Sequence, residues 1–465
     1  MILKTKKTHG SILILTLVFT GIFAVVAVGI ASVVNYQYKL AQAKIAWHNA
    51  LNIAEAGLNY YRWHLAHAPT DYQDGTAQPG PYVHDYLDPQ GAVFGQYKLE
   101  ITPPNLCTQN ITIQSTGWTS AAPQTKRKLQ IKYGKKSLAN FAFITNTDAW
   151  FGSQETIHGL IHSNGGIHQD GTNDSQVTSA RQTYTCTRSQ GCSYSQTKPG
   201  VWGTGENNDL WSYPVSNIDF NALTVNLAAL KNLATSSGIY LPQRGLGYHI
   251  RFKADGKIDV YRVTSLETPV TYYDMNGDKK RDSWDIDREE PYPDYFNYQL
   301  PSDCVIIFVE DDVWVDGTVN GRVTIAAAKL PEVPNNRRNI IINDNIVYQQ
   351  KNGDDVLGLI AQQDIMVPFY SAPNTLEINA AMIAQNGSVY RPYYPNDIKD
   401  TITVYGSIIT NQTWTWTWVS SGSWVTSGYQ HTNTQYDSHL TYGPPPSFPS
   451  VDEYSILQWE EITEK

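Results

Sequence analysis

The segment with the clearest chemical pattern is an acidic stretch of twelve residues, DMNGDKKRDSWD, that begins at Asp274. Carboxylate and amide oxygens at positions 1, 3, 5, 9 and 12 of such a stretch point at a calcium ion, and the main-chain carbonyl at position 7 completes the set. The residues at these six positions are Asp274, Asn276, Asp278, Lys280, Asp282 and Asp285. The sequence therefore predicts one Ca²⁺ site, with a solvated acidic loop as the alternative.

Two features of this stretch bear on how strongly it would hold the ion. The aspartate at position 12, Asp285, resembles the dockerin variant of the EF-hand loop. Lys279, however, stands at the sixth position, where the sharp turn favours glycine. We therefore expect a dissociation constant at the weak end of the range for extracellular modules, about 10⁻⁴–10⁻³ M.

A histidine cluster is a second, weaker candidate for a metal site. The three side chains lie close in sequence but in a glycine-rich region, where histidines commonly cap turns. They are His158, His162 and His168. Turn capping is the favoured interpretation.

Paired acids raise the question of catalysis. Asp311/Asp312 and Asp354/Asp355 are carboxylate pairs of the type that glycosidases use. Adjacent residues of a strand point to opposite faces, so neither pair converges by itself. The sequence also contains no nucleophile elbow, Walker loop or dinucleotide-binding glycine motif. We therefore predict that the chain is not an enzyme.

The four cysteines point to an oxidising compartment. Cys186 and Cys192 bracket a short polar loop and are expected to form a local disulfide outside the membrane. A zinc pair is the weaker alternative, because no second close Cys or His pair lies nearby. Whether Cys107 and Cys304 are paired or free is left open by the sequence.

The chain that contains these residues begins with a long apolar segment that is predicted to be a helix. Residues 11–34 contain no charge, and at about 1.5 Å per residue they cross a hydrocarbon core of about 30 Å. Only a ten-residue leader with three lysines precedes them, which predicts a cytoplasmic N-terminus and an extracytoplasmic C-terminal part. From Asn35 an amphipathic pattern continues without proline as far as Pro69, so we expect one helix to about Leu65.

The leader and the helix together resemble a type IV prepilin. The resemblance implies that prepilin peptidase cleaves after Gly10 and that Ser11 becomes the mature N-terminus. A second motif sharpens it, because residues 54–58 look like the AEAGL signature of PilX-type minor pilins. The signature residues are Ala54, Glu55, Ala56, Gly57 and Leu58.

One position departs from most major pilins. They carry glutamate at the fifth mature position, where this chain has Leu15. PilX-type pilins and the K-type pseudopilins of type II secretion also lack that glutamate. The departure favours a minor subunit, located at the tip of a filament. The family resemblance further implies a single pass through the inner (cytoplasmic) membrane and a place in a cell-surface filament after assembly.

The rest of the chain reads as mostly β structure, giving an α+β fold class. Strands are predicted at 97–101, 111–118 and 127–134, followed by short apolar segments separated by polar corners. We favour a parallel β-solenoid for those segments, with a β-sandwich as the alternative. The predicted divisions are leader 1–10, helix 11–66, small pilin-like sheet 67–136, solenoid-like domain 137–410 with an insertion at 172–302, and aromatic cap with extended tail 411–465.

Two elements are expected inside the insertion. Residues 216–238 show helical periodicity closed by a glycine, and residues 248–263 form a hairpin that turns at Asp255-Gly256. Near the C-terminus, Trp414, Trp416 and Trp418 alternate along one face of a predicted strand. We expect that face to be buried as a cap; an exposed platform for stacking sugars is the alternative.

Composition narrows the function. A net charge of −9 and the absence of a basic stripe argue against a nucleic-acid partner. The leading hypothesis is a minor pilin-like structural subunit of a type IV pilus or related secretion filament, whose partners are other pilins, prepilin peptidase and the membrane. The alternatives are a membrane-anchored adhesin that binds surface glycans and, more weakly, a β-helix polysaccharide lyase or hydrolase.

Overall fold

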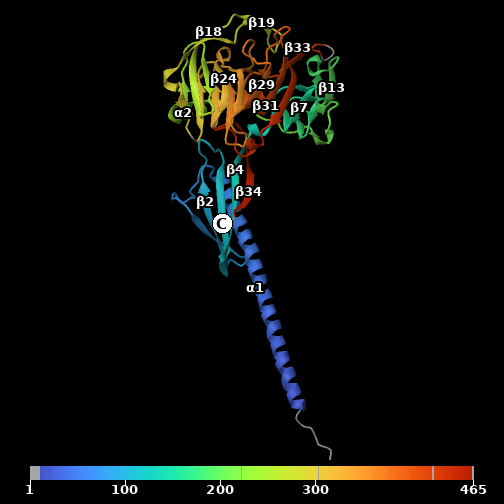
Figure 1. Cartoon of the computed structure of the whole chain (residues 1–465), viewed down its shortest axis with the longest axis vertical. Helices are drawn as coiled ribbons and strands as arrows, with labels where there is room; N and C mark the ends of the chain where they lie inside the picture. Colours follow the sequence, from blue (N-terminus) through green and yellow to red (C-terminus); the bar gives the residue numbers. More distant parts are fainter. Residues whose placement is uncertain (1–10, 221, 302, 421–423, 463–465) are drawn as a thin grey trace, which may run out of the picture. The chain divides into compact units, whose positions relative to one another are not determined.

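The computed structural model describes residues 11–220, 222–301, 303–420 and 424–462 (Figure 1). The chain divides into two compact units. Unit 1 comprises Met1–Pro103, Ile111–Tyr133 and Gln458–Lys465, and unit 2 comprises Pro104–Asn110 and Gly134–Leu457. The leader predicted at residues 1–10, including Gly10, lies outside the described residues.

Unit 1 is built on one helix, α1 (Ser11–His67), of 57 residues. The helix is continuous because its sequence is apolar or alanine-rich and contains no proline, and Pro69 excludes a further turn. The prediction of a long N-terminal apolar helix is confirmed. It ends two residues beyond the expected Leu65, which is within the usual uncertainty of helix ends.

A five-stranded sheet completes unit 1. Its order is β1-β2-β3-β4-β34, and the pairs β1–β2, β2–β3 and β3–β4 are antiparallel. The five strands are β1 (Tyr82–Leu87), β2 (Val93–Thr102), β3 (Ile111–Thr119), β4 (Ala122–Ser137) and β34 (Ser450–Ile462). The three strands predicted from sequence correspond to β2, β3 and β4. The strand β1 was not among the predicted strands, and β34 falls in the expected extended tail.

The core of unit 1 lies between the C-terminal half of α1 and one face of this sheet. Helix residues Ile53, Leu58 and Tyr61 pack with strand residues such as Leu99 and Ile131. Every second residue of β3 faces this core, which is the alternation of a strand covered on one side.

Unit 2 is dominated by a 22-stranded sheet in which most neighbours are parallel. One ladder of parallel pairs runs from strand to strand through the unit. Its members are β16 (Ile239–Leu241), β23 (Val305–Val309), β25 (Arg322–Ala327), β27 (Val356–Ala361), β29 (Thr375–Ala384), β31 (Ile398–Thr410), β5 (Phe143–Thr145), β8 (Ile161–Ser163), β11 (Val177–Ser179) and β15 (Trp211–Ser212).

Further parallel ladders run beside the first. A second one contains β17 (Tyr248–Phe252), β24 (Val313–Val319), β26 (Ile340–Tyr348), β28 (Ile365–Met366) and β30 (Val389–Tyr390). A third joins β31 to β33 (Val425–Tyr436), β7 (Glu155–His158) and β10 (Thr172–Asn173), and a short one joins β6 (Ala149–Phe151), β9 (Ile167–Gln169) and β14 (Val201–Trp202). Several strands of the predicted insertion at 172–302 belong to the same sheet as its flanks, because β10, β11, β15, β16 and β17 extend the parallel ladders.

Unit 2 also contains antiparallel hairpins and the helix α2. The hairpin predicted at 248–263 is confirmed, with β17 paired to β18 (Lys257–Leu266). The remaining strands are β12 (Thr183–Cys186), β13 (Gln196–Pro199), β19 (Val270–Tyr273), β20 (Lys279–Asp282), β21 (Ile286–Pro291), β22 (Tyr298–Gln299) and β32 (Thr417–Val419). The helix predicted at 216–238 corresponds to α2 (Ala222–Ser237).

Central strands of the first ladder, such as β23 and β27, are buried on both faces. In β23, Val305, Ile307 and Val309 belong to the larger apolar core, whereas Ile306 and Phe308 face a second core that Leu230 of α2 also enters. A strand covered on both sides reads as a continuous apolar run rather than an alternation. This explains the uninterrupted sequence VIIFV.

Polar side chains link the corners from one strand layer to the next. Asp312 Oδ1 accepts the main-chain N–H of Asn339 at 2.7 Å, and Asn339 Oδ1 accepts that of Asp364 at 3.2 Å. Asp364 Oδ1 in turn accepts the N–H of Ser388 at 2.7 Å. Burial raises the pKa of both Asp312 and Asp364 to about 6. The polar corners that separate the apolar segments in the sequence therefore satisfy main-chain groups.

Candidate functional site

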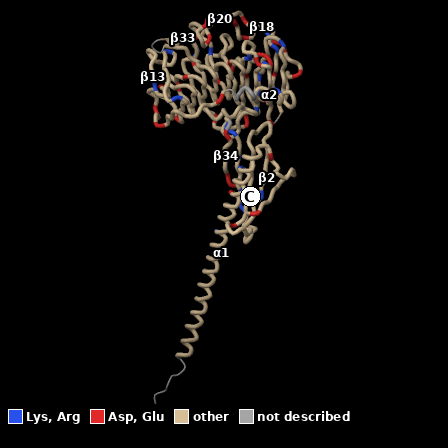
Figure 2. The backbone as a smooth tube through the Cα atoms, turned by 180° about the vertical axis from the view of Figure 1, so that it is seen from behind, with Lys and Arg blue, Asp and Glu red and all other residues tan. Residues whose placement is uncertain are grey.

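The most unusual surface of the molecule is the N-terminal half of α1. Its large apolar side chains are exposed from Ile12 to Trp47. Residues 11–38 carry no charge, and Figure 2 shows this part of α1 without acidic or basic positions. Among the described residues, α1 is the one helix long and apolar enough to cross a membrane. Such a surface is unstable in water and needs lipid or other apolar helices around it.

The C-terminal half of α1 is held against the sheet by small residues. A Cβ atom on Gly117 of β3 would overlap the main-chain atoms of Ala50 and Ala54. A Cβ atom on Gly57 of α1 would overlap the hydroxyl of Ser115 and lie 2.8 Å from Cδ2 of Tyr97. The helix and β3 therefore approach to main-chain distance, which only small side chains permit.

This seam gives the AEAGL segment a structural role. Ala54 and Leu58 are buried, and Gly57 packs on the sheet as described, while Ala56 is half-buried. Glu55 points away from the core and is exposed. Four of the five signature residues thus lie at or near the helix–sheet seam, and the glutamate is the one that remains available to solvent.

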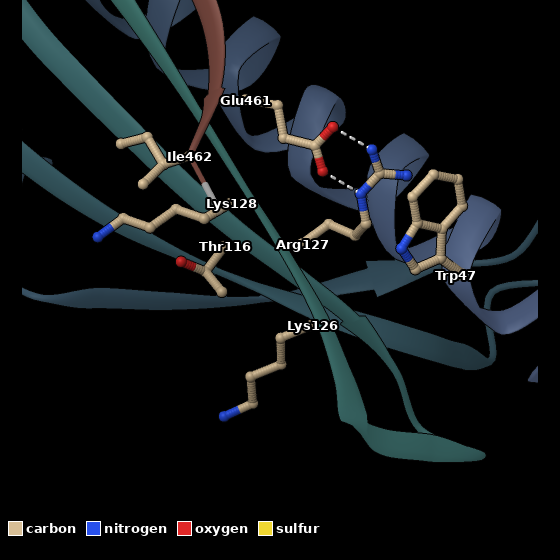
Figure 3. A pocket seen from close by; sticks show the side chains of 7 residues that line it. All are labelled: Trp47, Thr116, Lys126, Arg127, Lys128, Glu461 and Ile462. Carbon is tan, nitrogen blue, oxygen red and sulfur yellow. Dashed lines mark hydrogen bonds and ion pairs between the residues drawn. The ribbon is translucent and has the colours of Figure 1, made fainter. Parts of the chain in front are cut away.

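Arg127 contacts both Trp47 and Glu461 where α1 extends beyond the sheet. The guanidinium carbon of Arg127 lies 3.4 Å from the ring centroid of Trp47, and the same group forms a two-pronged ion pair with Glu461 of β34 (Figure 3). Nearby, Gln130 donates to Glu460 at 2.6 Å. Residues that are distant in sequence thus join α1, β4 and β34, and no short-range pattern could have revealed this.

The acidic stretch proposed for calcium forms the turn of the β19–β20 hairpin. Asp274 Oδ1 accepts the main-chain N–H groups of Asn276 and Asp278 at 2.9 and 3.0 Å. The Nζ of Lys280 lies 3.6 Å from Asp274, and Asp282 is an exposed residue at the end of β20. The stretch therefore places most of the predicted ligands at or near one turn.

The twelfth position is used differently. Asp285 is buried, and its carboxylate accepts main-chain N–H groups of Phe369, Tyr370 and Ser371 at 2.7 to 3.1 Å. Within the described residues, no group of three or more His, Cys, Asp or Glu side chains is arranged to hold a metal ion. Calcium binding stays a prediction.

Each of the three histidines has its own partners. His158 contacts Asp174 at 2.7 Å. The buried His162 contacts Asn164 at 3.0 Å, and burial lowers its pKa. His168 contacts Asp170 at 2.9 Å. These separate partners explain the histidines as capping and packing groups.

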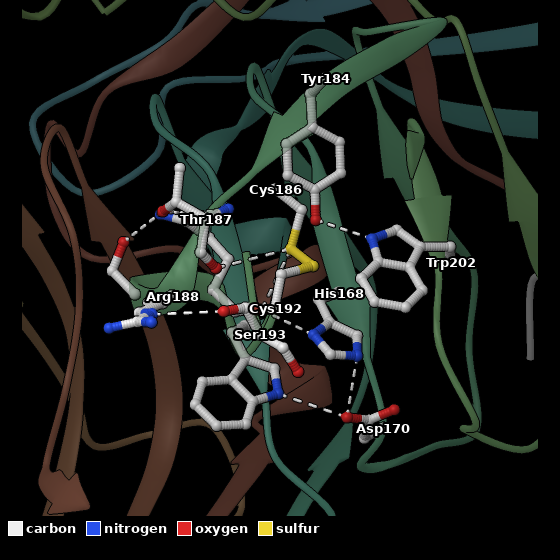
Figure 4. Close-up of a disulfide and its surroundings, with 12 residues drawn as sticks. His168, Asp170, Tyr184, Cys186, Thr187, Arg188, Cys192, Ser193 and Trp202 are labelled. Carbon is white, nitrogen blue, oxygen red and sulfur yellow. Dashed lines mark hydrogen bonds and ion pairs between the residues drawn. A yellow bond between two sulfur atoms is a disulfide. The ribbon is translucent and has the colours of Figure 1, made fainter. Parts of the chain in front are cut away.

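The local disulfide lies beside His168. Cys186 and Cys192 are bonded, and both are buried (Figure 4). The His168 ring stacks on Trp202 with centroids 3.8 Å apart, and the indole N–H of Trp202 donates to the Tyr184 hydroxyl at 2.9 Å. The bond closes the loop whose Gln190 carbonyl contacts His168 Nδ1 at 2.6 Å. A second disulfide joins Cys107 to Cys304, the pairing that the sequence left open.

The acid pairs do not form catalytic dyads. Asp311 accepts a main-chain N–H from the segment before β17, whereas Asp312 serves the corner ladder. Asp355 accepts two main-chain N–H groups, and Asp354 accepts an amide N–H of a neighbouring side chain. Each carboxylate therefore has a local structural partner.

The tryptophan segment is largely internal. Trp416 is buried in the larger core, Trp414 packs against Phe143, and the indole N–H of Trp418 donates to a main-chain carbonyl at 2.8 Å. Trp424 is 76% exposed. These positions favour a buried cap for the first three rings, and glycan binding stays a prediction.

Comparison with known proteins adds little to this geometry. No protein-family model matches the chain, and no curated protein matches it. Among solved structures, the competence-associated pilin ComZ from Thermus thermophilus aligns with 90% of this chain and 98% of its own, at 16% identity and a TM-score of 0.35. At these values the likeness assigns neither a fold nor a function to this chain.

Proposed function

We propose that the chain is a pilin-like structural subunit, of the PilX-type minor class, that joins a type IV pilus or a related secretion filament through α1. The observation that carries this proposal is the division of α1 into two halves. One half is packed against the sheet of unit 1, and the other exposes large apolar side chains along its length. A helix with this division is suited to leave the membrane and pack beside other apolar helices.

The exposed half of α1 can leave the membrane at low cost in free energy only if it enters another apolar environment. Burying one Val, Leu, Ile or Phe side chain stabilises by about 1.5–3 kcal/mol relative to water. The exposed half of α1 carries many of them, so it does not remain in solvent. A membrane holds it before assembly, and a bundle of pilin helices holds it afterwards.

Processing belongs to the same proposal. Prepilin peptidase would cleave between Gly10 and Ser11, releasing the lysine-rich leader and freeing the helix for assembly. Leu15, in place of a glutamate, fits a minor subunit at the filament tip. A large head of about 400 residues is also better suited to a tip than to repetition along a shaft.

We also propose that unit 2 is a parallel β-solenoid. Support comes from the ladders of parallel strand pairs, from the polar corners that connect successive layers, and from strands buried on both faces. The strands of a β-sandwich pair antiparallel, so the alternative accounts less well for these ladders.

The test is filament entry with and without the cleavage site. A Gly10→Leu variant should keep its leader, remain in the membrane fraction and be missing from filaments sheared from the cell surface. A Gly152→Leu variant is the matched control, because nothing lies within 4 Å of a Cβ atom at Gly152, which belongs to unit 2 and not to α1. If the Gly10→Leu protein enters filaments as well as wild type, the proposed function fails.

A further inference from the structure

A buried histidine of unit 2 lies between two carboxylates and has no part in the proposed function. His249 of β17 is 1% exposed. Its Nδ1 lies 2.7 Å from Oε2 of Glu289 in β21, and its Nε2 lies 2.9 Å from Oδ2 of Asp316 in β24. One imidazole ring therefore connects β17 to both β21 and β24.

These two contacts specify the protonation state of the ring. An ionised carboxylate only accepts hydrogen bonds, and a neutral imidazole has a single N–H donor. Two carboxylate partners therefore require the doubly protonated imidazolium. The proton belongs to the ring rather than to a carboxyl group, because the ordinary pKa of histidine is about two units above that of glutamate.

The other groups around His249 balance its charge. Arg251 Nε donates to Asp316 Oδ1 at 3.0 Å, and Asn343 of β26 donates to Asp316 Oδ2 at 2.9 Å. The Tyr261 ring of β18 stacks on the imidazole, with the two ring centroids 5.7 Å apart. Two cations therefore face two carboxylates. Loss of the His249 proton would leave Arg251 as the single cation among these residues.

The strand β21 directly follows a segment that covers one face of the second ladder. Residues 266–286, which we call the cover, connect β18 to β21. Successive strands of the ladder contribute four apolar side chains in register, Trp314, Ile341, Met366 and Tyr390. The side chains of the cover that pack in this cluster are Leu266, Met275, Trp284 and Ile286. His249 lies in register with Trp314, so its contact with Glu289 fixes β21 at one end of the covered cluster.

We propose that protonated His249 holds β21, and with it the cover, on the second ladder, and that a rise in pH releases them. Burial alone would lower the pKa of His249, but its hydrogen bonds to Asp316 and Glu289 raise this pKa overall. The stabilisation is therefore complete below about pH 6.5, the ordinary pKa of histidine, and is lost as the pH rises through the raised pKa. Glu289 is the partner that separates, because Asp316 keeps its hydrogen bonds from Arg251 and Asn343.

Hydrogen exchange of the full-length protein in detergent, measured from pH 6.5 to pH 9, tests this inference. Protection factors remove the pH dependence of the intrinsic exchange rate. In peptides covering residues 266–291 they should fall with rising pH, by up to tenfold per pH unit, because opening releases one proton. These residues contain no histidine or cysteine, the side chains whose ordinary pKa values lie in this range. Protection factors that stay constant in wild type overturn the inference.

Three variants assign the effect to this histidine. His249→Gln should lower the protection of the same peptides at pH 6.5 and remove its pH dependence. His158→Gln is the matched control and should behave as wild type, because His158 also belongs to unit 2 but is exposed and contacts a different carboxylate, that of Asp174. Glu289→Gln leaves the histidine in place and should reduce the pH dependence, so it decides the question if His249→Gln does not fold. Wild-type pH dependence in the variant at position 249 or at position 289 would contradict the inference.

Discussion

The closeness of α1 to β3 yields a quantitative prediction about Gly117. A Cβ atom there would overlap the main-chain atoms of Ala50 and Ala54, and a backbone cannot move aside as a flexible side chain can. Gly117→Val raises the intrinsic strand preference of the position, yet it should destabilise unit 1. Overpacking of this kind costs about 1–3 kcal/mol, and the overlap with two main-chain groups places the variant near 3 kcal/mol.

Hydrogen exchange of the full-length protein in detergent measures this effect where it occurs. A loss of about 3 kcal/mol corresponds to roughly a hundredfold faster exchange of amides protected by the seam, in peptides covering residues 50–65 and β3. Gly152→Ala is the matched control, because nothing lies within 4 Å of a Cβ atom there, and it should change exchange little. Wild-type exchange rates in the Gly117→Val protein would refute main-chain contact between α1 and β3.

Three further predictions concern unit 2. Cys107→Ser removes the disulfide that closes a loop with a sequence separation of 197, and the loop entropy predicts a loss of about 5 kcal/mol in the free energy of unfolding. Cys186→Ser removes the disulfide with a separation of 6, and the expected loss is about 2 kcal/mol. Denaturant unfolding of the two variants and of wild type, without reductant, measures both losses. Burial raises the pKa of Asp364 to about 6, so the folded state holds the carboxyl proton more tightly than the unfolded state does. The free energy of unfolding therefore falls as the pH rises from 4 to 6. In unfolding titrations, the free energy of unfolding of Asp364→Asn relative to wild type should therefore increase by up to about 3 kcal/mol from pH 4 to pH 7. A difference between the two proteins that does not change with pH would contradict this. Calcium should bind the turn with a dissociation constant near 10⁻³ M, and Asp274→Ala with Asp278→Ala should abolish the calorimetric signal; a flat wild-type titration removes the site.

Sequence reasoning succeeded where the determinants are local. The length of α1 follows from an apolar run without proline, and the hairpin at Asp255-Gly256 follows from its turn residues, with Gly256 at φ +80°. The strands β2, β3 and β4 alternate clearly enough to be read directly. In each case neighbouring residues determine the structure.

The features that sequence reasoning missed depend on distant residues. The strand β34 was expected as an extended tail, because prolines precede it and its partner β4 lies more than 300 residues earlier. The Arg127–Glu461 ion pair and the Cys107–Cys304 disulfide were not predicted for the same reason, because the two partners of each lie far apart in the sequence. For Asp285, spacing suggested a calcium ligand, but the carboxylate is engaged by three main-chain N–H groups of another segment. Spacing specifies which side chains could converge, whereas packing decides which of them do.

The most direct test of the filament hypothesis is the mature N-terminus of this chain in sheared surface filaments. Mass spectrometry of tryptic peptides from that fraction should find the chain beginning at Ser11, and a strain without prepilin peptidase should yield none of it there. A chain that begins at Met1 and is confined to the membrane fraction would contradict the account.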